Sequence, residues 1–254
     1  MKRREIGLAF IIAVAIAASI LSLPEFLEPF AKLTLERLGP YWSLAVFVVG
    51  LVDGLEPDED SWPVTLTYAM MQRSKKGVLV AVSVFAAALT LVWTLVSLLA
   101  GMALWHVNSD ALAPYADVLL GITMLAAAYV LTRRADKSVE ARDGKAEKEV
   151  AIADLKVILV HGIVAAFGGG GDVIIILVIA AALAPFIGAS LLWVVGLFYG
   201  AGSWMSQMVV VSALWGATGK AAETPETMAR AGRLVLLFLG VFTLALGVLL
   251  MAGL

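Results

Sequence analysis

The most regular feature of the chain is a series of apolar runs of 18 to 35 residues, separated by mostly polar segments. A helix of roughly 20 apolar residues crosses a hydrocarbon core of about 30 Å. The runs cover 6–23, 41–72, 78–104, 115–132, 153–187, 189–216 and 234–254. This pattern predicts an all-α polytopic membrane protein with about seven transmembrane helices.

The charged segments predict the side of the membrane that each helix end faces. Lys and Arg concentrate in "RSKK" (73–76), in a charged linker (133–152) and in a polar loop (217–233), whereas the segment 24–40 has prolines and mixed charge. Because positive residues favour the cytoplasmic side, we expect the first three segments to be cytoplasmic and 24–40 to be an external loop. The N-terminus is then cytoplasmic and the C-terminus outside a prokaryotic-type plasma membrane.

The basic start followed by the apolar run 6–23 also fits a cleavable signal peptide. The run is longer than the apolar core of a typical signal peptide, however. We therefore expect residues 1–23 to form a retained N-terminal transmembrane helix.

The apolar run 41–72 is interrupted by an acidic segment, "DGLEPDEDSW" (53–62). The apolar pieces on either side, 41–52 and 63–72, are too short to span a membrane, since twelve helical residues cover about 18 Å. Gly54 and Pro57 lie inside the interruption and oppose a continuous helix. Non-helical backbone at membrane depth is tolerated only where it lines a cavity or is buried in protein. The segment is therefore predicted to be a broken helix with acidic residues at the break.

A second interruption occurs in the run 153–187. The half-span "LKVILVHGIVAAF" (155–167) is followed by four glycines (168–171) and then by Asp172, which we expect to be the N-cap of a helix over 172–187. The two halves, 41–132 and 153–254, then form a 3+3 inverted repeat with a broken helix in each. Paired interrupted segments point to a transport site near the membrane midplane. The alternative is two unrelated kinks.

The composition of the chain excludes several kinds of binding site. The chain of 254 residues is 61% hydrophobic, against about 45–50% in soluble domains, and it has no cysteine and two histidines. Disulfides, thiolate metal sites, Fe–S clusters and a multi-imidazole site are therefore excluded within one chain. A net charge of −2 argues against a nucleic-acid partner.

The segment "GLVDGLEPDED" (50–60) resembles the GLxHALDADH signature of the nickel/cobalt exporter (NicO-like) family. The register places Asp53 on the first histidine, Glu56 and Asp58 on the two aspartates, and Glu59 on the second histidine. The segment "GGGGDVIIIL" is similar to Gly/Asp elements of the wider LysE-type exporter superfamily, whose layout also resembles the CcdA/DsbD transmembrane fold. The resemblance implies a 3+3 helical fold and cation export. Both signature histidines are carboxylates here, which disfavours nickel and cobalt, and the thiol electron carriers need cysteines that this chain does not have.

Acidic residues within a membrane span are costly, by roughly 2.5–3.5 kcal/mol each on insertion scales, and they indicate function. Oxygen ligands without sulfur suit hard divalent cations such as Mn²⁺, Ca²⁺ or Mg²⁺. Protons would compete with the cation for the same acids. The predicted metal ligands are Asp53, Glu56, Asp58, Asp60 and Asp172.

Other polar residues in the apolar runs are weaker candidates. His161 is a candidate proton relay, although a lone histidine in an apolar segment is more often a packing residue. Ser203, Ser206 and Gln207 have the spacing of one helix face, and they either line a cavity or form interhelical hydrogen bonds.

The sequence therefore predicts a proton-coupled secondary transporter of a divalent cation. Two alternatives stay open: a transporter of a small organic or anionic solute in the same fold, and an assembly subunit of a membrane complex. We expect neither enzymatic activity nor a resident cofactor, because no nucleophile–base pair, HExxH or nucleotide-binding motif is present. The expected partners are membrane lipid, the cation and protons, and a homo-oligomer is an open alternative.

Overall fold

The computed structural model describes residues 3–22, 33–34, 37, 41–57, 61–72, 74–100, 109–140, 145–167, 171–222 and 224–252. Every regular element in these residues is a helix, which confirms the all-α prediction. The α-helices are α1 (Arg3–Ser22), α3 (Trp42–Asp53), α4 (Trp62–Met70), α5 (Lys75–Ala100), α6 (Ser109–Glu140), α7 (Lys145–Ala165), α8 (Gly171–Ile187), α9 (Trp193–Ala222) and α10 (Pro225–Met251). A short 3₁₀ helix, η2 (Ala189–Leu191), precedes α9.

Three helical stretches among the described residues are long and apolar enough to cross a membrane. They are Lys75–Ala100, Ala189–Gly219 and Glu226–Met251, and shorter apolar helices cover Ile6–Ser19, Trp42–Asp53, Leu155–Ala165 and Asp172–Ile187. Large apolar side chains also point outward from these helices, as Ile11 and Val209 do, each 67% exposed. An outward apolar surface of this kind suits a lipid environment. The helical membrane class is thus supported, while the number of seven spans stays a prediction.

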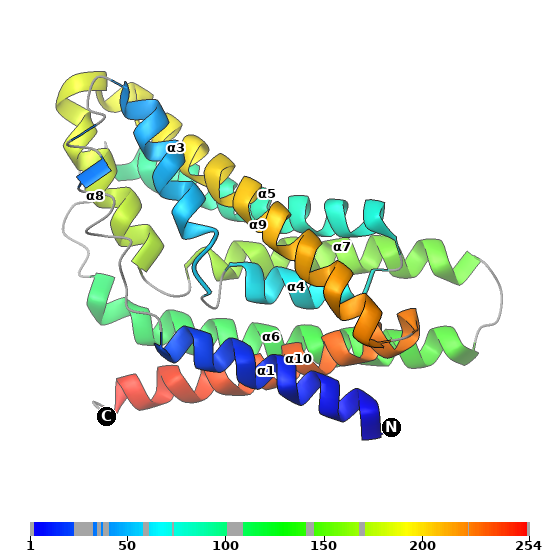
Figure 1. Ribbon diagram of the computed structural model, residues 1–254. Coiled ribbons are helices and arrows are strands. Elements are labelled where there is room, and N and C mark those ends of the chain that lie inside the picture. Colours follow the sequence, from blue (N-terminus) through cyan, green and yellow to red (C-terminus); the bar gives the residue numbers. More distant parts are fainter. Residues whose placement is uncertain are drawn as a thin grey trace.

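The long helices pack as pairs (Figure 1). Helix α5 packs along α9, and α6 packs along α10. Helix α3 packs against α9, α7 packs against α5, and α1 lies on α10. The short helix α4 is enclosed by its neighbours, and every residue from Pro63 to Met70 is buried.

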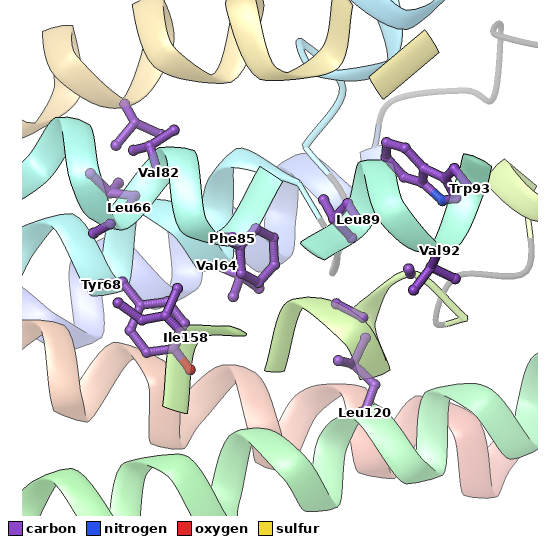
Figure 2. Packing of buried hydrophobic residues seen from close by; sticks show 14 of the residues in the cluster. Val64, Leu66, Tyr68, Val82, Phe85, Leu89, Val92, Trp93, Leu120 and Ile158 are labelled. Carbon is purple, nitrogen blue, oxygen red and sulfur yellow. The ribbon is translucent and has the colours of Figure 1, made fainter. Parts of the chain in front are cut away.

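The hydrophobic core follows α5 through the centre of the bundle. One face of this helix contributes Val82, Phe85, Leu89, Val92 and Trp93 to the buried cluster (Figure 2). Their spacing of three or four residues is that of a single helical face. Because α5 contacts α4, α7, α8 and α9, its position determines how both broken helices are placed.

Both predicted helix breaks are confirmed, with one correction. Helix α3 ends at Asp53 and α4 begins at Trp62, while α7 ends at Ala165 and α8 begins at Gly171. Asp172 is therefore in the first turn of α8 and is not its N-cap. A carboxylate in a first turn still interacts favourably with the helix dipole.

Two polar segments are more helical than the sequence indicated. Helix α6 continues to Glu140 and α7 begins at Lys145, so most of the charged linker 133–152 is helical. The prediction of a polar loop over 217–233 was wrong, because α9 runs to Ala222 and α10 begins at Pro225. Thr224 caps α10 by accepting a hydrogen bond from the Thr227 backbone N–H at 3.1 Å, and proline is well suited to the first helical turn. Most of the predicted external loop 24–40 lies outside the described residues.

Candidate functional site

Asp53 is the last residue of α3, and it is buried with 2% of its surface exposed. Two glycines bring its helix against α9 without an intervening side chain. A Cβ on Gly50 would overlap the backbone of Tyr199, and a Cβ on Gly54 would overlap Ser203 and Ser206. Close backbone approach through small residues is typical of membrane helix pairs. The contact places the Asp53 carboxyl group directly beside α9.

Tyr199 on α9 joins Asp53 to Asp172, which belongs to the other broken helix. The Tyr199 hydroxyl donates to Asp53 Oδ1 at 2.7 Å and lies 3.2 Å from Asp172 Oδ1. Asp172 is also buried, with 8% exposed. A phenol has one hydrogen, so it satisfies one of these two carboxyl groups at a time. The structure therefore brings together two of the five predicted ligands.

The two carboxyl groups lie close to each other, because an oxygen of each is within hydrogen-bond distance of the same Tyr199 hydroxyl. Two ionised carboxyl groups in one buried site repel each other, and a proton on either group relieves that repulsion. The pair is thus suited to holding either a proton or a cation between its oxygens.

A chain of buried hydrogen bonds leads from this pair to α4. Gln207 Nε2 donates to Ser203 Oγ at 3.0 Å, and Thr65 Oγ1 lies 3.4 Å from Gln207 Oε1. Gln207 has no exposed surface, and Ser203 and Thr65 are each 1% exposed. Ser206 donates to backbone carbonyls of its own helix. Of the predicted stripe on α9, Ser203 and Gln207 belong to the network and Ser206 packs against Gly54.

His161 lies on α7 and has no exposed surface. Its Nδ1 is 2.6 Å from the hydroxyl oxygen of Tyr68, and its ring meets the Tyr68 and Phe85 rings edge to face. Its Nε2 is buried and has no hydrogen-bond partner among the described residues. The imidazole therefore has one satisfied and one unsatisfied nitrogen, which is rare for a buried polar group.

The rest of the acidic segment is described only in part. Glu56 is half-buried, and its backbone carbonyl accepts a hydrogen bond from Ser61 Oγ at 2.6 Å. The predicted ligands Asp58 and Asp60 lie outside the described residues. Within the residues that are described, no three His, Asp or Glu side chains gather closely enough to hold a metal ion.

Two of the most central residues were missed at the level of sequence. Tyr199 lies four residues before Ser203, and Thr65 lies four residues after Ser61, so each continues a polar pattern at helical spacing. Tyrosine and threonine are ordinary members of apolar runs, and only their spacing from Ser203 and Ser61 could have singled them out.

The described site offers two carboxyl groups, the hydroxyls of Tyr199 and Ser203, and the Gln207 amide one contact further on. All of these groups offer an oxygen atom as a ligand, and none offers sulfur. Comparison of the chain with protein-family models, with curated proteins and with solved structures found no match, so the likeness to the nickel/cobalt exporters rests on its motif.

Proposed function

We propose that the protein is a secondary transporter that exchanges a hard divalent cation for protons at the Asp53–Asp172 pair. The observation that carries the proposal is the meeting of these two carboxyl groups at one Tyr199 hydroxyl, between two broken helices. Buried acids are rare in helical membrane proteins and mark ion paths. Here each acid comes from a different half of the chain, so a movement of one half against the other changes the site.

The position of Ser203 supports a location near the membrane midplane. Gly54, the neighbour of Asp53, packs against Ser203, which lies near the middle of the candidate span Ala189–Gly219. Half-helices that end at the depth of a binding site are typical of secondary transporters. The acids at the break are then within the span and not in an external vestibule.

The matching helix contacts in the two halves of the chain support the 3+3 inverted repeat. When α3, α4, α5 and α6 are matched in order with α7, α8, α9 and α10, α3 packs against α9 as α7 packs against α5. The matched helices α5 and α9 pack on each other, and so do α6 and α10. A twofold relation between the halves accounts for all of these contacts.

The placement of helix ends supports the predicted sidedness. In Figure 1 the start of α1, the end of α6, the start of α7 and the turn between α9 and α10 lie at one end of the bundle, at the right of the view. The chain ends at the opposite side. Lys and Arg concentrate in these segments, so this end is assigned to the cytoplasm.

Cation choice and coupling follow from the ligands. Carboxyl and hydroxyl oxygens suit Mg²⁺, Ca²⁺ and Mn²⁺ better than softer metals. Two carboxylates balance one divalent charge, and protons can replace the cation on the same oxygens. Cation binding on one side and proton binding on the other then drive exchange without any nucleotide.

The test is cation flux into proteoliposomes of the purified full chain. Mg²⁺, Ca²⁺, Mn²⁺, Co²⁺ and Ni²⁺ are compared with and without a pH gradient. We expect flux of at least one hard cation and a faster flux with the gradient. Flux restricted to Ni²⁺ or Co²⁺ would contradict the ligand argument, and no flux of any cation would overturn the proposal.

A further inference from the structure

A polar face runs along the buried helix α4. It consists of the N-cap residue Ser61 and then Thr65, Tyr68 and Gln72, each one helical turn after the last. Residues three or four apart lie on the same side of a helix. The first three are buried, Gln72 is half-buried, and Ser74 is exposed. Polarity thus continues from the middle of the protein to the end of α4 that adjoins the basic segment.

This face is connected to the carboxyl pair at its inner end. Thr65 contacts Gln207, which donates to Ser203, and Ser203 packs against Gly54, the neighbour of Asp53. One turn further along α4, the Tyr68 hydroxyl meets His161 Nδ1. A buried helix packed on all sides would ordinarily present apolar residues. The polar face therefore needs a reason beyond packing.

His161 provides that reason because its Nε2 is buried with no partner. Removing an imidazole nitrogen from water without a hydrogen bond costs free energy. The edge-to-face ring contacts to Tyr68 and Phe85 would be preserved by an aromatic residue without an unsatisfied nitrogen, and only the hydrogen bond to Tyr68 requires the imidazole. The free-energy cost of burying Nε2 without a partner is explained if this nitrogen binds a proton during transport.

We infer that His161 is a second proton-carrying site of the transporter, and that the polar face of α4 couples it to the Asp53–Asp172 pair. The inference rests on the proposed cation–proton exchange. It adds a carrier that lies outside the cation site, so protons reach or leave the pair without crossing the bound cation.

The proton balance at His161 uses both of its nitrogens. When Nδ1–H donates to the Tyr68 oxygen, Nε2 has a free lone pair and accepts a proton, which gives an imidazolium ion. The same proton leaves again from Nε2 and returns the ring to its neutral form, while Nδ1–H stays in its hydrogen bond to the Tyr68 oxygen. Nε2 therefore carries the proton, and the Nδ1 contact with Tyr68 positions the ring.

The residues packed around the ring limit the groups that can exchange a proton with it. Helix α4 contributes Tyr68, and α5 contributes Phe85 to the ring and Ala88 beside the neighbouring Gly162. Helix α6 also packs against α7, but of its charged residues with described side chains, neither Asp117 nor Arg133 contacts the imidazole. Tyr68 is the one titratable group in contact with the ring within the described chain.

The first test uses the scarcity of histidine. In His106→Gln, the one remaining imidazole is His161, and its ¹⁵N signals report its protonation and tautomer. We expect the signals to titrate, and the titration to move when Asp53→Asn is added. The matched control is Thr243→Val, which removes a buried hydroxyl on α10 away from this face, and it should leave the titration unchanged. An imidazole that does not titrate, or that ignores Asp53→Asn, overturns the inference.

The second test is transport by His161→Gln and by Tyr68→Phe. We expect uptake driven by a pH gradient to fall about tenfold, within the 5- to 150-fold range typical of coupling between two sites. Cation-for-cation exchange without a gradient should stay at the wild-type rate. If both modes stay at the wild-type rate, His161 carries no proton. If wild-type protein moves no cation in either mode, the proposed function fails, while the imidazole spectra still decide the coupling.

Discussion

Asp53 at the end of α3 accepts a hydrogen bond of 2.7 Å from Tyr199 on α9, although 146 residues separate them in the chain. The bond connects the two predicted repeats at the point where the first broken helix ends. The same hydroxyl reaches Asp172 of the second broken helix at 3.2 Å. Tyr199 is therefore the physical link between the two acids.

Tyr199→Phe removes that link and keeps the aromatic packing against Trp93, whose ring centroid is 5.1 Å away. The carboxyl pair loses the one hydrogen that this hydroxyl donates, and an unsatisfied buried polar group costs about 1–3 kcal/mol. We expect a loss of stability of about that size, measured by unfolding of the protein in detergent. Tyr129→Phe is the control because Tyr129 is 58% exposed, and it should unfold like the wild type.

Gly202 and Gly216 provide a matched pair on α9. A Cβ on Gly202 would overlap the Phe47 carbonyl of α3, whereas a Cβ on Gly216 meets nothing within 4 Å. We expect Gly202→Ala to destabilise by about 1–3 kcal/mol through overpacking. Gly216→Ala should be neutral or stabilise by up to about 1 kcal/mol, because alanine favours helix. Equal effects of the two variants on unfolding would contradict the close contact of α3 with α9.

Asp53→Asn and Asp172→Asn should not have additive effects on stability. The two carboxyl groups share the Tyr199 hydroxyl as a donor, so the loss of one changes the environment of the other. Interacting residues show coupling energies of about 0.5–3 kcal/mol in double-mutant cycles. Unfolding of both single variants and the double variant measures this coupling. Additivity within error would mean that the two acids act independently.

Asp53→His introduces the residue type that the nickel/cobalt exporter signature has at the matching position. Imidazole favours Ni²⁺ and Co²⁺ more than carboxylate does. A bound ligand at 100 times its Kd stabilises a protein by about 2.7 kcal/mol. We expect Ni²⁺ to stabilise this variant against unfolding and to have little effect on the wild type. If Ni²⁺ stabilises the variant and the wild type equally against unfolding, Asp53 does not determine which cation binds.

The broken helices could be predicted from the sequence because their causes are local. Gly54 and Pro57 interrupt an apolar run, and the half-spans beside them are too short to cross a membrane. The end of α9 and the start of α10 were missed because their residues are polar and charged, and a search for apolar runs assigns such residues to a loop. The sequence signal that a new helix begins there, Thr224 followed by Pro225, consists of only two residues.

The partners within the site could be predicted only in part. Spacing placed Ser203 and Gln207 on one helix face, and the acids marked both breaks. The pairing of Asp53 with Asp172 depends on how α3, α8 and α9 pack, which helix periodicity does not encode. The Tyr68–His161 contact likewise joins residues 93 positions apart, and neither belongs to a motif.

The measurement that tests the central claim most directly is cation flux in three variants that each remove one buried carboxylate. Asp53→Asn and Asp172→Asn change the pair, and Asp117→Asn changes an acid on α6 that is equally buried, with 4% exposed. The account predicts that the first two abolish flux of the transported cation and that Asp117→Asn retains it. Wild-type flux in Asp53→Asn and Asp172→Asn would show that the cation crosses elsewhere.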